Sequence, residues 1–387
     1  MRGGSDRVYL DWNATAPLAP AARAAVLAAL EVAGNPSSVH GEGRRARAIV
    51  EAARREVAAL VGADAAGVIF TSGGTEANVT ALAPIPGDRP TVLVVSAVEH
   101  PSVAAGGRFP RQDVRVAPVD GDGVIDLAAL ATIVDRVAGE GARPLVALML
   151  ANNETGVVQP VAAAAAIVHA AGGRLHVDAV QAAGRIPVDL AAIGADTLSL
   201  SGHKLGAPAG VGALVCAPGV EPVPLMTGGG QEMRRRAGTE NLTGIAGLGA
   251  ASRTARDGLA DSPAIARLRD WLESAIVPIY TGTTVFGQAA PRLPNTAAFA
   301  VPGTLAETIV MALDLEGIAV SSGAACSSGK VSASAVLAAM GVPDGLARGA
   351  VRVSLGRTTT EAEVARFVAA WRTVIGRFDA ARVGRAA

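Results

Sequence analysis

The chain contains few cysteines and has no excess of charge of either sign. Its 387 residues include only two cysteines, Cys216 and Cys326, too few for a disulfide framework. We therefore expect a reducing, cytoplasmic compartment. The 34 basic and 34 acidic side chains cancel to a net charge of 0. This balance argues against a dedicated nucleic-acid-binding protein, whose affinity comes largely from lysine and arginine.

Long apolar segments are also missing. The longest stretch without a charged residue, 155–173, is interrupted by Gln159, Pro160 and His169. A membrane-spanning helix needs about 18 or more mostly apolar residues. The first residues have no apolar core of the kind found in a secretory signal. We therefore expect neither a membrane span nor a secretory signal.

The chain does contain enough apolar residues to form a large hydrophobic core. Hydrophobic residues make up 50% of it and charged residues only 18%, which excludes an intrinsically disordered chain. The length favours two to three domain-sized units at roughly 150 residues each, or one large unit and a small one.

Short apolar runs alternate with alanine-rich segments through the first two-thirds of the chain. The runs predict strands at 67–70, 91–96, 145–150, 174–177, 197–201 and 211–215. The segments between them predict helices near 44–61, 75–83, 127–137 and 161–171. This alternation predicts an α/β fold with a mainly parallel sheet flanked by helices.

The pattern changes after a long helical segment at 242–276, which Asp257–Gly258 and Ser262–Pro263 interrupt. Beyond it, strands at 296–300, 318–320 and 351–355 alternate with helices at 305–315 and 361–375. We expect a large domain at 15–258 and a smaller α+β domain made of 1–14 and 259–387.

Three segments carry candidate chemistry. SGGTEAN (72–78) follows a predicted strand, and a glycine-rich helix start there would bind an anionic group, although Thr75 would also suit an ordinary helix cap. HVDAVQAAG (176–184) places Asp178 at a strand end, where it would contact a ligand or cap a helix. SLSGHKLGAPAGVGALV (199–215) places Lys204 among apolar residues, where it would be either reactive or at a loop edge.

Taken together, the three segments favour one cofactor. An anion site, a carboxylate and a lysine in this order on one parallel sheet suit pyridoxal 5′-phosphate (PLP). The helix start would hold the phosphate, Asp178 would pair with the pyridine nitrogen, and Lys204 would form a Schiff base with the aldehyde. No metal site is predicted.

At this point the chain resembles the fold-type I PLP-dependent enzymes, specifically the class V aminotransferase branch and the cysteine desulfurases of the NifS/IscS kind. The resemblance covers nearly the whole chain. Its further motifs are YLDWNATAP (9–17), NPSSVHGEGRRAR (35–47), EHPSV (99–103), ANNETGVVQP (151–160), RRRAGTEN (234–241), SSGAACSSGK (321–330) and RVSLGR (352–357).

The resemblance implies roles for individual residues. It implies that His100 stacks on the cofactor ring and helps the Lys204 amine to move the substrate α-proton, and that Asn153 and Gln181 contact the ring edge. It also implies that Arg352 binds the substrate carboxylate, with Asn153 as a second substrate-binding residue. It places Gly74, Thr75, Ser201 and His203 around the phosphate. It implies that Thr239 reaches the phosphate of the other subunit's cofactor, which would make the protein a homodimer.

Cys326 decides between activities of this family. It lies in a run of serine, glycine and alanine with Lys330 close by, which is typical of an accessible thiolate, whereas Cys216 lies in an apolar strand like a small buried hydrophobe. The resemblance implies that Cys326 takes sulfur from L-cysteine as a persulfide. It would pass this sulfur to an acceptor such as an iron–sulfur scaffold or a tRNA-thiolation protein, with L-alanine released.

The chain also departs from the family's pattern. Trp12 and Ala16 replace asparagine and threonine, and Ser334 stands where many relatives have histidine, which would affect the entrance or the partner surface. Another class V enzyme, such as a selenocysteine lyase or an aminotransferase, would keep Lys204 and Asp178 without needing a cysteine in this position. A non-catalytic scaffold would be expected to lose Lys204 or Arg352.

Overall fold

The computed structural model describes residues 7–323 and 334–386, with side chains to residue 378. Its centre is a seven-stranded sheet in the order β2-β8-β7-β6-β5-β3-β4. The strands are β2 (Val68–Thr71), β3 (Thr91–Ser96), β4 (Val114–Ala117), β5 (Arg143–Met149), β6 (Arg174–Asp178), β7 (Thr197–Ser201) and β8 (Gly212–Cys216). Strand β8 is antiparallel to both its neighbours, and the other pairs are parallel. The predicted α/β class with a mainly parallel sheet is therefore confirmed.

Six of the seven strands were predicted, and several of them, such as β3 and β8, are the continuous apolar runs expected of strands covered by helices. Strand β4 was missed. It lies at the edge of the sheet, and its two central side chains are exposed, so Val114–Ala117 has no continuous apolar run.

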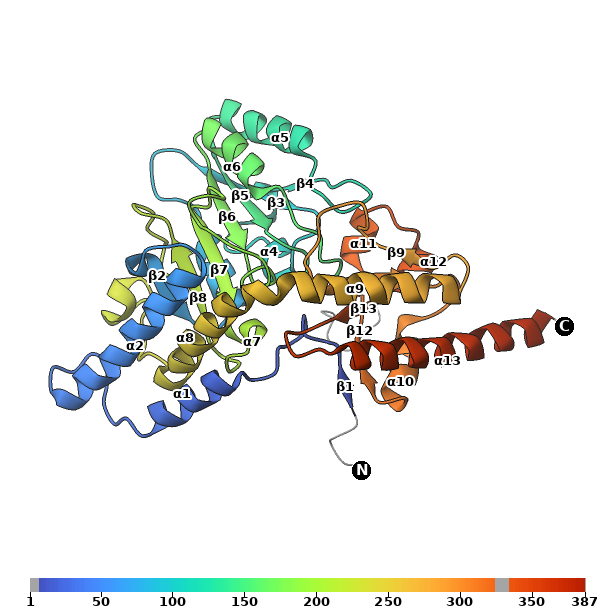
Figure 1. The fold of residues 1–387 in the computed structure, drawn as a ribbon. Helices are drawn as coiled ribbons and strands as arrows, with labels where there is room; N and C mark the ends of the chain where they lie inside the picture. The colour runs from blue at the N-terminus through green and yellow to red at the C-terminus, as the bar shows by residue number, and fades with distance from the viewer. Residues whose placement is uncertain (1–6, 324–333, 387) are drawn as a thin grey trace.

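Helices cover the sheet as Figure 1 shows, with α1, α2 and α8 close together and α5 and α6 near β4, β5 and β3. They are α1 (Pro20–Leu30), α2 (Gly41–Leu60), α3 (Gly74–Ala81), α4 (Pro101–Ala104), α5 (Leu127–Gly139), α6 (Val161–Ala170), α7 (Gly202–Leu205) and α8 (Leu242–Asp257). The contact between α2 and α8 requires a residue without a side chain. A Cβ atom on Gly249 would lie 2.6 Å from the Cα atom of Ala53, so glycine lets the two helices approach closely.

The predicted interruption of the long helical segment is present. Helix α8 ends at Asp257, a 3₁₀ turn spans Gly258–Asp261, and α9 begins as Ser262–Ile276 with proline in its first turn. Figure 1 shows α9 extending from α8 towards the elements that follow it in the chain.

These later elements form two smaller sheets. A four-stranded antiparallel sheet has the order β12-β13-β10-β9, and β1 pairs in parallel with β11. The elements are β1 (Val8–Tyr9), β9 (Thr284–Val285), β10 (Thr296–Ala300), α10 (Ala306–Leu315), β11 (Ile318–Ala319), β12 (Ser321–Ser322), α11 (Ala335–Ala339), α12 (Asp344–Ala347), β13 (Val351–Ser354) and α13 (Glu361–Ala386). The division into domains at 15–258 and at 1–14 with 259–387 stays a prediction.

Aromatic side chains are few in this chain, and three of them join α13 to the smaller sheet. The Phe299 ring on β10 meets the Trp371 ring edge-on at 5.0 Å between centroids, and Phe367 stacks on Trp371 at 6.1 Å. All three side chains are fully buried, so this contact orients β10 and its neighbour β13, which carries Arg352. Among the described helices, none is both long and apolar enough to cross a membrane.

Candidate active site

A cavity of about 500 Å³ lies where β5, β6 and β7 end, with Met149, Asp178 and Ser201 in its wall. This is the edge at which open α/β sheets bind ligands, and the volume lies in the range of small-molecule sites. Ten residues predicted from the sequence line it: Gly74, Thr75, His100, Asn153, Asp178, Gln181, Ser201, His203, Lys204 and Arg352.

Lys204 reaches this cavity from α7, the single helical turn that follows β7. Gly206 ends the turn in a left-handed conformation with φ of 87°. The Lys204 Nζ atom donates to the backbone carbonyls of Asn13 and Ala14, the second at 2.8 Å. The amine therefore lies at the cavity wall, held by backbone oxygens, and not at an exposed loop edge.

Asp178 is the last residue of β6 and has both carboxylate oxygens bonded. Its Oδ1 atom accepts from the Val180 backbone N–H at 2.9 Å, and its Oδ2 atom accepts from the Asn78 side chain at 2.8 Å. The side chain is buried at the cavity wall. A fixed carboxylate there can pair with a protonated ring nitrogen.

His100 caps the N-terminus of α4. Its Nδ1 atom lies 2.8 Å from the Ser102 hydroxyl and accepts from the Ser102 backbone N–H at 3.2 Å. Burial lowers the pKa of His100, because the charged ring loses hydration; the nearby Asp178 opposes this shift and Lys204 adds to it.

The predicted anion site is the start of α3. The helix begins at Gly74 with Gly73 as its cap, so Thr75 is not the cap. A Cβ atom on Gly73 would meet no atom within 4 Å, whereas one on Gly74 would lie 2.9 Å from Val180 and 3.3 Å from Ser201. Gly73 thus leaves open space in front of the first N–H groups of the helix, which have no partners within the helix itself, while Gly74 lets the helix start pack closely against Val180 and Ser201.

Gln181 and His203 complete this wall. The Gln181 Nε2 atom donates to the carbonyl of Asn13 at 3.1 Å, and Arg185 donates to its Oε1 atom, which fixes the orientation of the amide. Burial, with a smaller effect from the charge of Lys204, lowers the pKa of His203 to about 4, so the ring is neutral at pH 7.

Arg352 enters the cavity from β13 and is almost fully buried. Its guanidinium donates to Asp11 at 2.8 Å and to the carbonyl of Asn153 at 3.0 Å. Its Nε atom is buried and has no hydrogen-bond partner among the described residues. The two printed bonds use one N–H of each terminal nitrogen, so the guanidinium keeps a second N–H on each of them for a carboxylate ligand.

These residues fit PLP. The open glycine cradle suits the phosphate, the buried Asp178 suits the ring nitrogen, and the Lys204 amine suits the aldehyde. All three groups line the same cavity. Three different anchors in one wall match the three polar ends of one cofactor.

Residues 8–367 match the model of the family described as aminotransferase class-V. The chain belongs to this family. The predicted resemblance to the class V branch and the predicted PLP cofactor are thereby confirmed. The enzyme is 48% identical to a cysteine desulfurase of Cereibacter sphaeroides and 45% identical to one of Rhodobacter capsulatus, with 94% of each chain covered in both alignments.

Solved structures agree with this assignment. A NifS-like protein from Rickettsia africae superposes with a TM-score of 0.86 at 32% identity, over 96% of this chain and 99% of that one. A structure described as SspA in complex with cysteine gives a TM-score of 0.77 at 27% identity, over 91% of this chain and all of the other. The fold-type I architecture is confirmed.

Of the two other predicted site residues, only Thr239 is described, and it does not line the cavity. Thr239 is exposed on the segment before α8. Cys326 lies outside the described residues. The other cysteine, Cys216, is buried in β8, and burial raises the pKa of its thiol to about 12. Within the described part of the chain, no group of three or more His, Cys, Asp or Glu side chains could hold a metal ion.

Several residues of the site were not predicted. Asn78 and Ser102 hold Asp178 and His100, while Asn13 and Asp11 hold Lys204 and Arg352. All four stand inside motifs that carried the family resemblance. The sequence signal for these four residues was a polar side chain close to a buried strand. Their hydrogen-bond partners, however, are distant in sequence.

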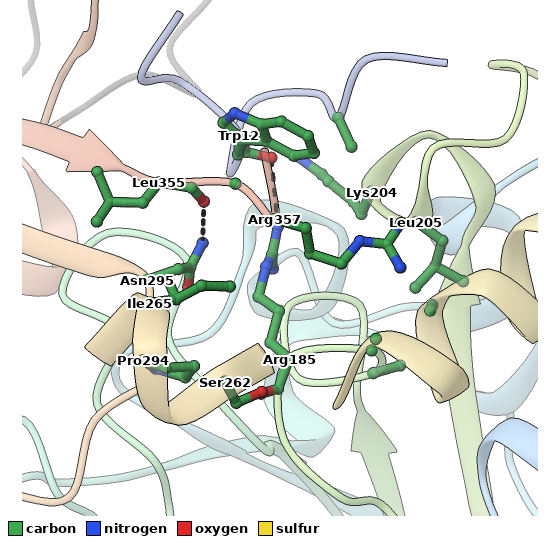
Figure 2. Close-up of a pocket in the computed structure, with 16 residues that line it drawn as sticks. Trp12, Arg185, Lys204, Leu205, Ser262, Ile265, Pro294, Asn295, Leu355 and Arg357 are labelled. Carbon is green, nitrogen blue, oxygen red and sulfur yellow. Dashed lines mark hydrogen bonds between the residues drawn. The ribbon is translucent and has the colours of Figure 1, made fainter. Parts of the chain in front are cut away.

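The unusual residues Trp12 and Ala16 lie beside Lys204. They line a second, smaller cavity of about 40 Å³, shown in Figure 2, together with Lys204, Arg185 and Arg357. The indole occupies the space that a side chain on Gly356 would need, since a Cβ atom there would lie 1.7 Å from the Trp12 ring. Their effect on the entrance or the partner surface stays a prediction.

Ser334, the third unusual residue, caps α11, and its hydroxyl also donates to the Glu154 carboxylate. Burial raises the pKa of Glu154 to about 7, against the opposing effects of the Ser334 hydrogen bond and the nearby Arg352. A titratable carboxyl group therefore directly follows Asn153, which itself lines the cavity.

Proposed function

We propose that this enzyme is a cysteine desulfurase, which removes sulfur from L-cysteine, releases L-alanine and holds the sulfur as a persulfide on Cys326. The observation that carries the proposal is the meeting of Lys204, Asp178 and the unsatisfied Arg352 around one cavity. Relatives named cysteine desulfurase, 40–48% identical over most of the chain, support it.

Arg352 would bind the substrate carboxylate. Its guanidinium is already oriented by Asp11 and by the Asn153 carbonyl, each through one N–H of a terminal nitrogen, so the second N–H of each terminal nitrogen remains for the ligand. Charge-assisted bonds to a carboxylate are stronger than neutral ones, and arginine offers several parallel donors.

Lys204 would move the proton of the substrate α-carbon. Its amine lies in the cavity within reach of the backbone carbonyls of residues 13 and 14, which can hold it as an ammonium group. PLP, when bound, withdraws the electron pair that this proton leaves behind. Asp178 keeps the ring nitrogen protonated, which strengthens that withdrawal.

The sulfur transfer balances without a further reactant. The Cys326 thiolate forms an S–S bond with the substrate sulfur, and the bond between this sulfur and the substrate β-carbon breaks. The electron pair of the broken bond stays with carbon, which takes up a proton and leaves as part of alanine. Cysteine and an enzyme thiol thus give alanine and an enzyme persulfide.

The main competitor is another class V activity, a selenocysteine lyase or an aminotransferase. These would use Lys204, Asp178 and Arg352 in the same way but would not depend on a thiol. The neighbour described as SspA in complex with cysteine favours cysteine as the substrate of this enzyme.

Homodimerisation, the sulfur acceptor and the compartment are proposed as well. Thr239 is exposed and outside its own chain's cavity, which is consistent with a role at a partner's site. The acceptor would be an iron–sulfur scaffold or a thiolation protein, and the compartment would be the cytoplasm.

The test is to incubate the purified, PLP-loaded enzyme with L-cysteine and to measure alanine, sulfide in the presence of a reductant, and protein persulfide. Alanine and persulfide formed in equal amounts in the first turnover support the proposal. Pyruvate, or amino-group transfer to a keto acid, in place of alanine would overturn it.

A further inference from the structure

The Asn78 side chain is completely hydrogen-bonded, and it lies between two groups of the candidate site. Its Nδ2 atom is 2.8 Å from Asp178 Oδ2 and 2.8 Å from the Ser102 hydroxyl. Its Oδ1 atom accepts from the Ser199 hydroxyl and is 2.9 Å from His176 Nε2. The side chain is almost fully buried, so all four of its bonding positions are used away from water.

The carboxylate of Asp178 decides which way the Asn78 amide points. An ionised carboxylate only accepts hydrogen bonds, so the group that faces it must be the NH₂ of the amide. The opposite orientation would place the amide oxygen against a carboxylate oxygen at 2.8 Å and would leave the Ser199 hydroxyl and His176 Nε2 facing an NH₂ group. The hydrogen-bond network permits one orientation.

The direction of the next bond follows. Because Asn78 donates to the Ser102 oxygen, the Ser102 hydroxyl hydrogen is left for its other neighbour, His100 Nδ1, at 2.8 Å. The Ser102 backbone N–H, at 3.2 Å, donates to the same nitrogen. Two donors converge on Nδ1, so this atom must be the unprotonated nitrogen of the ring.

We infer that Asp178, through Asn78 and Ser102, fixes the proton of His100 on Nε2, and that Asn78 is the positioning residue of this chain of hydrogen bonds. Nε2 has no protein partner among the described residues, and His100 lines the cavity. His100 therefore offers an N–H donor from its free nitrogen. It can accept a proton only at Nδ1, where both bonds from Ser102 would have to break.

His176 extends the same network behind Asp178. Its Nε2 atom must carry a proton to donate to the Asn78 oxygen, so its Nδ1 atom accepts from the Thr197 hydroxyl at 2.9 Å. Burial lowers the pKa of His176 to about 3, which agrees with a neutral ring. A charged His176 would have to donate from both nitrogens.

This assignment gives His100 a specific part in turnover, and that part rests on the function proposed above. A neutral ring with its proton on Nε2 donates a hydrogen bond to substrate or cofactor but does not act as the base for the α-proton. That task is left to Lys204. The position of the proton itself follows from the hydrogen-bond network alone.

The experiment is ¹⁵N magic-angle-spinning NMR of the PLP-loaded enzyme with labelled histidine. The chain has five histidines, and a spectrum of His100→Gln assigns the His100 signals. We expect one tautomer for His100 in the wild type, with the proton on Nε2. A proton on Nδ1, or a mixture of tautomers, would overturn the inference.

Variants test the path. Asn78→Ala frees the Ser102 hydroxyl to rotate, and Ser102→Ala removes it. In both variants the backbone N–H of residue 102, at 3.2 Å, is the one fixed donor left to Nδ1, so both should produce a measurable Nδ1–H population. Ser102→Thr retains the hydroxyl and should retain the single tautomer. Ser199→Ala is the matched control, because it removes a bond to the same amide on its oxygen side and should leave His100 unchanged.

The variants can also contradict the inference. If both Asn78→Ala and Ser102→Ala keep the pure Nε2–H form, Asn78 does not control the tautomer, and the positioning role is wrong. The NMR result is independent of turnover. An enzyme that forms no alanine would refute the proposed desulfurase function while leaving the His100 assignment in place.

Discussion

The carboxylate of Asp11 lies 2.8 Å from the guanidinium of Arg352, and the two residues are 341 positions apart in the chain. Only 2% of the Arg352 side chain is exposed, compared with 17% for Asp11. The Ser321 hydroxyl donates to the second Asp11 oxygen at 2.8 Å, so the carboxylate is itself oriented. The arginine is thus positioned before any substrate carboxylate arrives.

This relationship predicts a substrate-binding defect for Asp11→Ala. Without the carboxylate, the Arg352 guanidinium loses one of its two orienting contacts and its charge loses a buried partner. We expect KM for cysteine to rise by about tenfold, equivalent to about 1.4 kcal/mol for a charge-assisted bond, with a smaller change in kcat. Steady-state alanine formation measures both constants.

Asp11→Asn is the matched variant. Its amide oxygen can still accept from Arg352 while its NH₂ donates to the Ser321 oxygen, so most of the orientation should be retained. A KM for Asp11→Ala equal to that of the wild type would show that Asp11 does not position Arg352.

Asp178→Asn should separate cofactor binding from chemistry. The glycine cradle and Lys204 remain, so PLP should still bind. The amide cannot keep the ring nitrogen protonated, and we expect turnover to fall by about 100-fold or more. PLP content from absorbance and alanine formation are the two measurements, and unchanged turnover would mean that Asp178 only caps the chain after β6.

The parts of this fold that the sequence predicted are those with a local signal. Strands such as β3 and β8, with every residue buried, stand out as apolar runs, and the break between α8 and α9 stands out as a change in pattern. Edge strand β4 has no such signal, because its exposed side faces solvent, where polar residues are tolerated.

The site residues divide in the same way, into those with a local signal in the sequence and those without one. Lys204 and Asp178 could be predicted because Asp178 ends a buried strand and Lys204 closely follows one, each in a segment that suits a cofactor. Asn13 could not, since its carbonyl contacts Lys204 and Gln181, and its side chain meets residues 295 and 296. Such contacts exist only after the strands are assembled, and no spacing in the sequence encodes them.

Glu154 gives a prediction about pH. Its pKa is raised from 4.5 to about 7, so the folded protein favours the protonated form. The stabilisation that the raised pKa of Glu154 gives the folded protein is fully present below about pH 4.5. It is lost as the pH rises through about 7. At pH 8 the wild type should therefore carry a penalty of about 3 kcal/mol that Glu154→Gln lacks, because one pKa unit corresponds to about 1.4 kcal/mol.

Unfolding midpoints of both proteins with saturating PLP, from pH 5 to pH 8, measure this effect. The midpoint of Glu154→Gln relative to the wild type should rise steadily across this range. A constant difference between the two proteins would show that Glu154 is ionised throughout.

Subunit mixing tests the proposed homodimer. If Thr239 serves the partner's phosphate, Lys204→Ala and Thr239→Ala inactivate different halves of a shared site, so a hybrid dimer contains one site free of both substitutions. We expect activity to return after subunit exchange between the two variants, provided that Thr239→Ala alone is severely impaired. Verified hybrids without activity would mean that each site is built from a single chain.

The two cysteines separate the desulfurase from the other activities of this family. Cys326→Ser should bind PLP normally and change its visible spectrum when cysteine is added, because these events depend on Lys204, Asp178 and Arg352. It should form no persulfide and release almost no alanine. A hydroxyl ionises far less readily than a thiol at neutral pH, so serine cannot supply a comparable nucleophile.

Cys216→Ser is the matched control for Cys326→Ser. Cys216 packs in β8 against Ile69, Ala77 and Leu214, and burial keeps its thiol protonated with a pKa of about 12. A buried serine hydroxyl loses its hydration without a hydrogen-bond partner placed to replace it. This variant should therefore lose about 1–3 kcal/mol of stability but keep its persulfide. Mass spectrometry of the three proteins after incubation with cysteine detects the added sulfur. If Cys326→Ser released alanine at the wild-type rate, the thiol would have no part in the reaction, and the lyase or aminotransferase activity would replace the one proposed.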